Sequence, residues 1–197
     1  KAAFKSGVGL VTLAIPSDIY GVVANQCPEC LMLPLSSNDG SFAANALLDL
    51  DLSSYKVIAF GPGLGRQVNG KQLLSTLLAK CTHQAIVIDA DGLYFYKQLV
   101  DEGMTYKDGD IILTPHPGEM ATLTGRSVAE IEANRLQIAR DFAMQYEVYV
   151  LLKGHRPIIT TPEGQLYINP HGNDALGKGG SGDILTGLIT SYKTQGV

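Results

Sequence analysis

The feature that most constrains the fold of this chain is the alternation of short apolar runs with stretches of helical pattern. The apolar runs contain few polar residues, which is typical of strands covered on both faces of a sheet. We expect six such strands, at residues 8–15, 31–35, 56–60, 85–89, 110–113 and 147–152. Strands that alternate with helices indicate βαβ units. The sequence therefore predicts an α/β fold with a mostly parallel central sheet flanked by helices on both faces.

Helical and hairpin patterns occupy segments between and after these runs. Residues 68–80 place four leucines on one apolar face, and residues 127–145 open with a Ser-x-x-Glu capping box, so both stretches predict helices. Two further strand-like runs, 157–161 and 165–169, are separated by Pro162-Glu163-Gly164. That connection predicts a hairpin that forms an antiparallel edge of the sheet.

The size of the chain indicates one domain. It has 197 residues, of which 45% are hydrophobic and 17% charged, so it can bury a full core, and we expect residues 1–197 to be a single domain. Residues 1–6 have the pattern of the last turns of a helix, and the chain closes inside another helix that runs from Asp183 to about Gln195. We therefore expect flanking segments at both ends that this sequence lacks.

Charge and hydropathy exclude several classes of function. The net charge of −4 argues against a protein that binds nucleic acid, which needs a clustered excess of Lys and Arg. No apolar run approaches the roughly 18–20 residues of a membrane span. The start of the chain lacks the pattern of a signal peptide. We expect a cytoplasmic protein that acts on small molecules, without a nucleic-acid or membrane partner.

The three cysteines, Cys27, Cys30 and Cys81, are too few for a disulfide framework, and reduced thiols fit the cytoplasm. Cys27-x-x-Cys30 has the spacing of a redox-active pair or of half a zinc site. Zinc needs two further ligands, and no second pair of suitable spacing exists. A thioredoxin-type pair follows a strand at a helix start, whereas this pair precedes the strand-like run 31–35. The sequence therefore disfavours a functional role for the pair.

Ligands of open parallel sheets bind at the carboxyl ends of the strands. Glycine-rich or polar segments follow the predicted strands, and their recurrence at one rim predicts the site. These segments are Gly61–Gly65, Asp89–Asp91, Thr114–Glu119, Lys153–His155 and Asn173–Asp183.

The segment Gly180-Ser181-Gly182-Asp183 is a glycine turn that leads into a helix. Backbone N–H groups converge at a helix start, where the helix dipole adds about half a positive charge. Such a turn binds an anion or stabilises a migrating phosphoryl group. Asp183 beside it is placed to accept a proton from a substrate hydroxyl. The alternative is an ordinary first-turn acid that favours the helix dipole.

Other rim residues have one functional and one structural interpretation. His116 lies between two prolines that stiffen the chain, which favours contact with a ligand. The glycines of 61–65 permit either a tight turn or the close approach of a ligand. Asp89 and Asp91 share one face if both lie in a strand, where they would hold water on Mg²⁺ or tether a ribose, but Asp89 alone would cap a helix. Lys153 would contact a phosphate or simply end a strand.

Six motifs run in order from Ala2 to Gly187: AAFKSGVGLVT, FGPGLGR, VIDADGL, LTPHPGEMATLTG, LLKG and GNDALGKGGSGDILTG. Together they resemble the ADP/ATP-dependent NAD(P)H-hydrate dehydratase family, a branch of the ribokinase-like fold. The HPGE segment and the block that contains GSGD are specific to this branch. The family carries a further segment at each end, in agreement with the helical patterns at both termini. It also suggests assembly into a homotetramer.

The resemblance implies metabolite repair, by a lyase, of NADH or NADPH that has been hydrated at ring carbon 6. The enzyme phosphorylates the new hydroxyl of the S epimer with ADP or ATP, and phosphate then leaves to restore the dihydropyridine. Asp183 is then the base, and Gly180, Ser181 and Gly182 stabilise the phosphoryl group. Mg²⁺ bridges the nucleotide phosphates, and Asp89 and Glu119 are the nearby carboxylates.

The resemblance also implies two binding sites. The residues that contact the hydrated cofactor are Ala2, Gly63, Gly65, His116 and Asp183. The residues that line the adenine nucleotide are Lys153, Gly154, His155, Arg156, Pro157, Asn173 and Gly182. The chain departs from the family in one segment: DADALN is common where this chain has DADGLY, and in it Tyr94 replaces an expected Asn.

Two other functions stay open. A kinase of a small hydroxymethyl compound, such as a vitamin precursor, has the same fold, uses Asp183 in the same way and stops at the phosphoester. The other alternative is a catalytically idle module that binds adenylates. The intact GSGD segment argues against the idle module.

Overall fold

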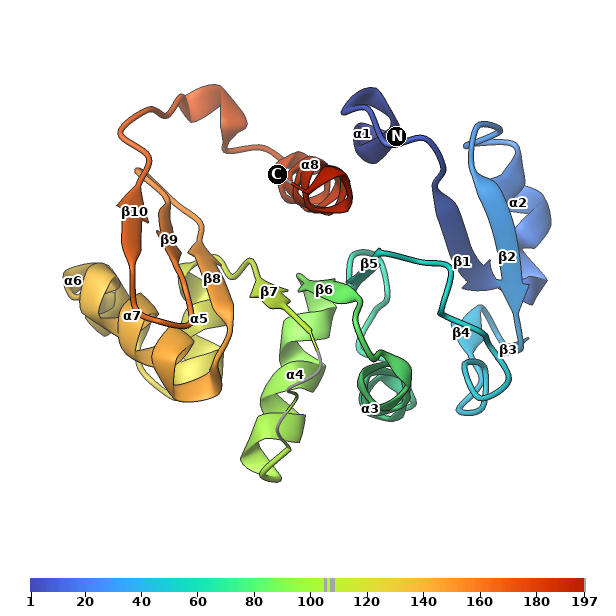
Figure 1. Ribbon diagram of the computed structural model, residues 1–197, viewed down its shortest axis with the longest axis horizontal. Coiled ribbons are helices and arrows are strands. Elements are labelled where there is room, and N and C mark those ends of the chain that lie inside the picture. Colours follow the sequence, from blue (N-terminus) through green and yellow to red (C-terminus); the bar gives the residue numbers. More distant parts are fainter. Residues whose placement is uncertain (105, 107–108, 197) are drawn as a thin grey trace.

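The computed structural model describes residues 1–104, 106 and 109–196. Its centre is a six-stranded sheet with the strand order β10-β9-β8-β7-β6-β5 (Figure 1). Strands β5 to β8 pair in parallel, whereas β9 pairs antiparallel with both β8 and β10. The strands are β5 (Val57–Phe60), β6 (Ala85–Ile88), β7 (Ile111–Leu113), β8 (Tyr149–Leu152), β9 (Ile158–Thr160) and β10 (Leu166–Ile168). The mostly parallel sheet and its antiparallel edge hairpin are confirmed.

Helices cover both faces of this sheet, as the sequence predicts. Helix α8 (Ser181–Gln195) lies on one face beside the short helix α1 (Ala2–Lys5), and five helices of the described part of the chain lie on the other face (Figure 1). These are α3 (Gly70–Lys80), α4 (Asp91–Asp101), α5 (Pro117–Thr124), α6 (Val128–Ala133) and α7 (Arg135–Tyr146). Among the residues that the structure describes, no helix combines the length and the apolar character needed to cross a bilayer.

The core forms where the continuous apolar runs meet the leucine face of α3. Strand β6 is covered on both faces, and Ile86, Val87 and Ile88 are each 0% exposed. This double burial explains why its sequence does not alternate between apolar and polar residues. The four leucines of α3 are at most 3% exposed, which confirms the predicted apolar face of that helix.

The N-terminal strands differ from the prediction. Strands β1 (Thr12–Pro16) and β2 (Leu31–Leu35) form a separate two-stranded parallel sheet, set apart from the main sheet (Figure 1). The predicted strand 8–15 is wrong over its first half, because pairing starts only where the Val11 carbonyl accepts from the Leu31 N–H (2.9 Å). Both strands are partly exposed, so the predicted cover on both faces is wrong for them. The remaining short elements are η1 (Ser17–Ile19), α2 (Tyr20–Ala24), β3 (Ser37–Asn38), β4 (Ser41–Phe42) and η2 (Asp174–Leu176).

The single helix predicted over 127–145 is two helices, α6 and α7. The capping box is confirmed: the Ser127 N–H donates to Glu130 Oε2 (2.8 Å), and the Glu130 N–H donates to Ser127 Oγ (3.3 Å). The break falls at Asn134, where φ is −133°. The Asn134 side chain donates to the Glu130 carbonyl (3.4 Å). Because such local hydrogen bonds compete with those of the helix, Asn is a common residue at helix ends.

Candidate functional site

The loops that follow the parallel strands meet at one rim of the sheet, as the sequence predicts. The Asp89 N–H donates to the Phe60 carbonyl (3.1 Å), and the Thr114 N–H donates to the Ile88 carbonyl (3.2 Å). The Lys153 N–H donates to the Pro115 carbonyl (2.8 Å). These bonds extend the sheet pairing just beyond β5 to β8 and hold the four loops side by side.

A cavity of about 200 Å³, here called the rim pocket, opens between three of these loops. It combines a cation, an aromatic face and two carboxylates: the Arg66 guanidinium lies 4.7 Å from the centre of the Tyr94 ring and 3.7 Å from Asp91. Tyr94, the residue that departs from the family pattern, is therefore part of the pocket. The lining residues are Arg66, Ala90, Asp91, Leu93, Tyr94, His116, Gly118, Glu119 and Thr122.

The glycines of the first rim loop have two different roles. Gly61 has a φ of +120°, and a Cβ there would lie 1.9 Å from the Asp89 carbonyl oxygen, so its packing against the next loop requires glycine. Gly63 and Gly65 also have positive φ, of +70° and +72°, but a Cβ on either meets no atom within 4 Å. The tight-turn interpretation thus describes Gly61, whereas the space beside Gly63 and Gly65 is open to a ligand, although the Gly65 N–H already donates to Asp91.

Asp89 and Asp91 do not share a face, so that prediction is wrong. Strand β6 ends at Ile88, and Ala90 adopts a strained turn with a φ of +50°, closed by the Gly92 N–H on the Asp89 carbonyl (3.0 Å). The turn directs Asp89 inward, where it is 2% exposed, and Asp91 outward to the Gly65 N–H (3.0 Å). The two carboxylates therefore serve different loops.

Below the rim pocket, a line of polar side chains connects it to helix α8. Glu119 Oε2 lies 3.6 Å from Lys153 Nζ, which donates to Asp89 Oδ1 (2.8 Å). The Thr186 hydroxyl, in α8, donates to Asp89 Oδ2 (2.7 Å). The Lys153 side chain is 20% exposed and the Asp89 side chain 3%, so this is a largely buried ion pair. The two partners are 64 residues apart in the chain.

The Asp89 carboxyl has a pKa below its ordinary value. Burial opposes its ionisation, but the hydrogen bonds from Lys153 and Thr186 and the charge of Lys153 outweigh burial. The buried Thr114 hydroxyl, which makes no close hydrogen bond of its own, adds to the lowering. Asp89 therefore stays ionised at neutral pH despite its position in the core.

This lowered pKa predicts acid lability. Asp89 has a lower pKa in the folded state than in the unfolded state. Its ion pair with Lys153 therefore stabilises the fold fully at pH values above the pKa of the unfolded state. This stabilisation is lost as the pH falls through the pKa of the folded state. We expect the free energy of unfolding, measured in urea between pH 7 and pH 3, to drop most steeply below about pH 4. In Asp89→Asn this part of the pH dependence should vanish. An unchanged slope in the variant would assign the acid lability to other groups.

His116 is held rigidly at the mouth of the rim pocket. Its Nδ1 accepts from the Glu119 N–H (3.1 Å), and Glu119 Oε2 accepts from the His116 N–H (2.7 Å), so the two residues form a capping box at the start of α5. Pro117 is the first residue of that helix, as the sequence predicts. The His116 side chain is 56% exposed, and its Nε2 lies 3.5 Å from Glu119 Oε1, so a ligand can reach the ring from solvent.

The glycine turn before α8 forms as predicted, and the helix begins at Ser181. Gly180 is left-handed, with a φ of +85°. A Cβ on Gly182 would lie 3.8 Å from both Asp89 Oδ2 and Lys153 Nζ, so the first turn of the helix sits directly over the buried ion pair. Asp183 is exposed, and no side-chain hydrogen bond or ion pair of Asp183 occurs within residues 1–104, 106 and 109–196. Its carboxylate is thus available to a substrate.

The structure places two further predicted residues away from the rim pocket. Ala2 packs on α8, where a Cβ on Gly187 would lie 2.9 Å from the Ala2 Cβ. Asn173 caps the short helix η2, and its Oδ1 accepts from the Ala175 N–H (2.8 Å). Both therefore lie on the α8 side of the site rather than in the rim pocket.

The predicted nucleotide loop, 153–157, depends on a residue that the sequence analysis missed. Arg135, at the start of α7, donates to the carbonyls of Lys153 (3.0 Å) and His155 (2.9 Å). His155 and Arg156 are exposed, and Arg156 has a φ of +53°. No local signal marks Arg135. Thr186, which is 3% exposed, was missed as well, because its spacing of three residues after the exposed Asp183 does not indicate an inward side chain.

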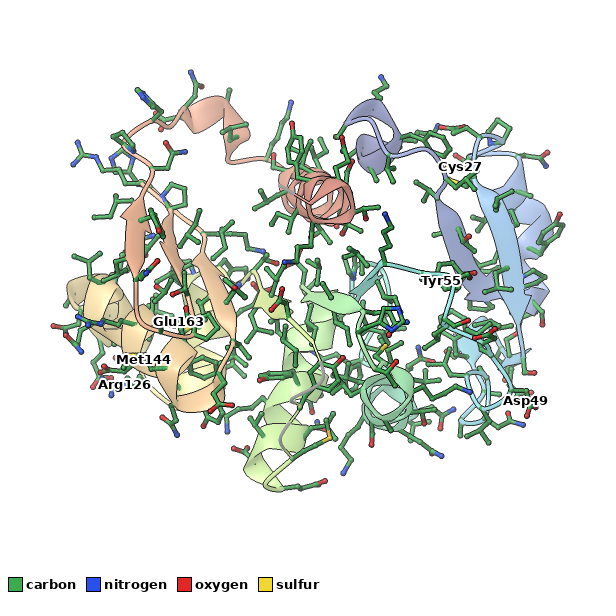
Figure 2. All side chains as sticks on the ribbon, viewed as in Figure 1. Cys27, Asp49, Tyr55, Arg126, Met144 and Glu163 are labelled. Carbon is green, nitrogen blue, oxygen red and sulfur yellow. The ribbon has the colours of Figure 1, made fainter. Side chains whose placement is uncertain are left out.

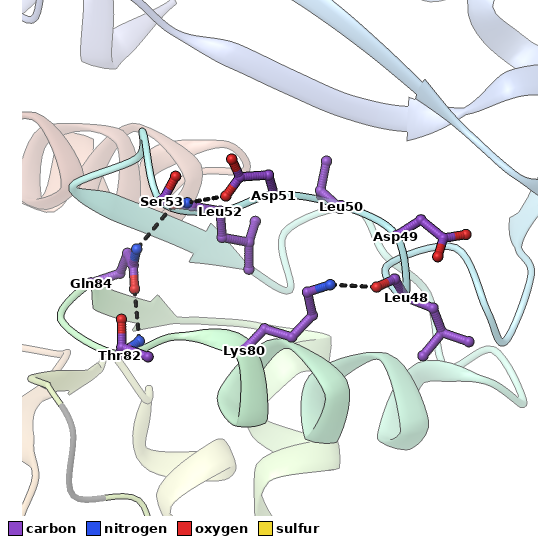
Figure 3. Close-up of a pocket in the computed structure, with 9 residues that line it drawn as sticks. All are labelled: Leu48, Asp49, Leu50, Asp51, Leu52, Ser53, Lys80, Thr82 and Gln84. Atoms are coloured by element: carbon purple, nitrogen blue, oxygen red, sulfur yellow. Dashed lines mark hydrogen bonds between the residues drawn. The ribbon is translucent and has the colours of Figure 1, made fainter.

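A second cavity, of about 400 Å³, contains none of the predicted site residues. It lies near Gln84, which precedes β6, whereas Asp89 follows that strand, so the two cavities are at opposite ends of the sheet. Figure 3 shows that its polar groups bond to one another: Lys80 donates to the Leu48 carbonyl, Gln84 to the Leu52 carbonyl (3.0 Å) and the Ser53 N–H to Asp51 (2.8 Å). We assign the candidate site to the rim pocket and the start of α8.

The carboxylates near α8 fit a Mg²⁺ ion only together with a phosphate ligand. In the described part of the chain, no three His, Cys, Asp or Glu residues gather as a metal cluster. Asp89 and Glu119 offer the oxygen ligands that Mg²⁺ prefers, but Lys153 already lies between them. Mg²⁺ in phosphate sites uses one or two carboxylates plus the phosphates, which agrees with this donor set.

Comparisons with known proteins agree on one protein family. A family model described as NAD(P)H-hydrate dehydratase matches residues 1–194. The bifunctional NAD(P)H-hydrate repair enzyme Nnr of Moorella thermoacetica is 40% identical over 201 residues, which cover 100% of this chain and 37% of that protein. The ADP-dependent (S)-NAD(P)H-hydrate dehydratase of Bacillus subtilis is 35% identical over 191 residues, which cover 95% of this chain and 63% of that protein. The chain thus spans less than two thirds of either relative.

Solved structures agree with these matches. A crystal structure of the ADP/ATP-dependent NAD(P)H-hydrate dehydratase from Bacillus subtilis, co-crystallised with ATP/Mg²⁺ and soaked with CoA, has a TM-score of 0.80 and 31% identity, and the match covers 98% of this chain and 66% of that one. A ribokinase-like superfamily protein from Enterococcus faecalis has a TM-score of 0.80 and 25% identity, covering 98% of this chain and 64% of that one. The predicted ribokinase-like fold is confirmed, and the match over residues 1–194 shows that the chain belongs to the NAD(P)H-hydrate dehydratase family.

Proposed function

We propose that the protein uses ADP or ATP to dehydrate the S epimer of hydrated NADH or NADPH and so restores the reduced cofactor. The observation that carries this proposal is the position of the first turn of α8. Gly182 lies over the Lys153–Asp89 pair, and the same lysine reaches Glu119 at the rim pocket. A phosphoryl-binding helix start and a pocket with an aromatic face are therefore connected by one short line of charged groups.

In this proposal, Asp183 accepts the proton of the substrate hydroxyl while the hydroxyl oxygen attacks the terminal phosphorus of the nucleotide. The bond from phosphorus to the bridging oxygen breaks, and the shortened nucleotide leaves. The N–H groups of the turn at 180–182 hold the charge on the migrating phosphoryl group. Phosphate then leaves ring carbon 6 with the electron pair of the C–O bond, and the neighbouring carbon gives up a proton to solvent, which restores the double bond. Phosphate is a much better leaving group than hydroxide, so the nucleotide drives the elimination.

We propose the binding residues that the family resemblance implies. We assign the hydrated cofactor to the rim pocket and its open glycine backbone, with His116, Gly63 and Gly65 in contact, and with Ala2 on the side of α8. We assign the adenine nucleotide to the loop 153–157 together with Asn173 and Gly182. Mg²⁺, when bound with the nucleotide, neutralises phosphate charge, and Glu119 and Asp89 are the carboxylates that would hold it.

The proposal is tested by absorbance at 340 nm. Enzymatically prepared hydrated NADH is incubated with the protein in magnesium buffer, with ADP, with ATP and without nucleotide. We expect a rise that requires a nucleotide, and the faster donor identifies the preferred one. If nucleotide binds but absorbance does not rise, the vitamin-precursor kinase becomes the better interpretation, and phosphorylated hydroxymethyl products are sought by mass spectrometry.

His116→Ala should weaken binding of the hydrated cofactor about 10-fold and leave nucleotide affinity nearly unchanged. The reason is that His116 lies at the rim pocket, whereas the Lys153 and His155 carbonyls of the loop 153–157 are held by Arg135. Loss of one hydrogen bond to a buried partner accounts for a change of that size. Isothermal titration calorimetry measures both affinities.

A matched control separates binding from helix capping. His116→Asn keeps a side chain that can accept from the Glu119 N–H, so it retains the cap while removing the ring. Equal losses for cofactor and nucleotide in the alanine variant, or full recovery of cofactor affinity in the asparagine variant, would remove His116 from the cofactor site.

We also propose that residues 1–197 act as a single ribokinase-like domain, that the protein assembles into a homotetramer and that it works in the cytoplasm. Family resemblance supports the tetramer, and the exposed apolar side chains of α8, such as Ile184 and Tyr192, are suited to a subunit contact. Light scattering coupled to size-exclusion chromatography gives the mass directly. A monomer at micromolar concentration would contradict the assembly.

A further inference from the structure

The Cys27-x-x-Cys30 motif lies in a tight turn between α2 and β2. The Cys30 N–H donates to the Cys27 carbonyl (3.1 Å), which makes residues 27–30 a β-turn with Pro28 as its second residue. The proline ring restricts that position to turn geometry. The turn leads directly into the first hydrogen bond between β1 and β2, from the Leu31 N–H. Figure 2 shows Cys27 near the start of β2, below α1.

The turn brings the two thiols face to face. Their sulfur atoms are 2.8 Å apart. Ordinary van der Waals contact is about 3.5–4.0 Å even between the smaller carbon atoms, and a disulfide bond is about 2.05 Å long. The sulfurs are thus inside non-bonded contact and less than about 1 Å from bonding distance. The two thiols are in hydrogen-bonding contact, and either one can be the donor.

The surroundings limit what the pair can do. Cys27 is buried and Cys30 is partly exposed, so a reagent reaches the pair through Cys30. The third cysteine, Cys81, directly follows α3 and is 1% exposed, so it is shielded from any reagent in solvent. Within the described residues, no third His, Cys, Asp or Glu joins the pair as a metal site.

We propose that Cys27 and Cys30 are a reversible modification site that forms an intramolecular disulfide when the protein meets a small-molecule disulfide. The Cys30 thiolate attacks one sulfur of the oxidant, forming a mixed disulfide and releasing one thiolate. Cys27 then loses its proton and attacks Cys30, which releases the second thiolate. Two protein thiols are oxidised to one disulfide, and the oxidant is reduced to two thiols, which take up the two protons.

This pair is not arranged as an oxidoreductase centre. Catalytic pairs lie at helix starts that stabilise the thiolate, whereas this turn leads into a strand. Burial, together with the neighbouring Cys27 and Glu29, raises the pKa of the Cys30 thiol to about 11, although the amino terminus opposes the shift. Thiolate is therefore scarce at neutral pH, and the pair exchanges slowly. Slow exchange suits a site that responds to prolonged exposure to an oxidant. Formation of the disulfide requires neither the substrate nor the nucleotide of the proposed function.

The test is a redox titration of the full chain with reduced and oxidised glutathione, at equilibrium and without oxygen. Free thiols are blocked with an alkylating reagent, and the protein is digested and analysed by mass spectrometry. We expect a linked Cys27–Cys30 peptide that is about 2 Da lighter than its reduced form, with Cys81 alkylated after unfolding. Because the folded turn holds the sulfurs together, its equilibrium constant should be at least about 10-fold higher than that of a synthetic peptide of residues 23–35.

Two variants serve as controls. The main test uses the unaltered chain, so it does not depend on the folding of either variant. Cys81→Ser should titrate like the parent, whereas Cys30→Ser should yield no linked peptide. Three outcomes overturn the proposal: thiols that stay reduced throughout, a glutathione adduct on Cys30 that never resolves, or an equilibrium constant no higher than that of the peptide.

Discussion

Asp183→Asn should lower the turnover number at least about 100-fold while the dissociation constant for ADP or ATP changes less than about 2-fold. Asp183 is exposed at the third position of α8 and carries no structural hydrogen bond or ion pair among the described residues. The amide keeps the size of the side chain and removes only its capacity to take a proton. General-base catalysis contributes typically 10²–10⁴-fold, which sets the size of the loss. The 340 nm assay gives the turnover number, and calorimetry gives nucleotide affinity.

Asp141→Asn is the matched control. It makes the same chemical change on an exposed side chain of α7, where Asp141 accepts a hydrogen bond from Gln137 (2.6 Å), and should leave turnover unchanged. A near-normal rate in Asp183→Asn would remove this residue from the mechanism and restore the alternative that it only favours the helix dipole.

Asp89→Asn should lower the free energy of unfolding by about 3–5 kcal/mol. The substitution leaves the Lys153 ammonium largely buried, with Glu119 at 3.6 Å as its remaining carboxylate. Removing one partner of a buried ion pair lowers stability because the other charge stays buried without its partner and without water. The Thr186 bond to the same side chain also weakens, so the start of α8 loses an anchor. Urea denaturation at pH 7 measures the change.

The control pair for this stability effect lies on the surface. Lys71 and Glu102 are 2.6 Å apart, with side chains 40% and 60% exposed, and Glu102→Gln should cost at most about 1 kcal/mol. The double variant Asp89→Asn/Lys153→Met should recover part of the loss, because it removes the stranded charge. A loss below about 1 kcal/mol in Asp89→Asn, or no recovery in the double variant, would show that the buried pair does not anchor the rim.

Several parts of the fold and the site could be predicted because their signals are local. The apolar run at β6 indicates a strand buried on both faces, the Ser127 capping box indicates a helix start, and Pro117 indicates the start of α5. The loops after the strands could be assigned to one rim because parallel strands share the direction of their ends. The sequence did not show that helix α6 ends at Asn134, since a single polar residue only weakly opposes a helix.

The pairing of the rim residues depends on long-range packing. Local patterns specify the α/β class, the order of the elements and the set of loops that meet at the rim, because periodicity and turn residues act over a few neighbours. Only the folded chain brought Asp89 to Lys153, 64 residues away, and to Thr186, 97 residues away. It also turned Asp91 away from Asp89 through the positive φ of Ala90. Such contacts depend on how whole elements pack, and no local pattern encodes the direction of a side chain relative to a distant strand.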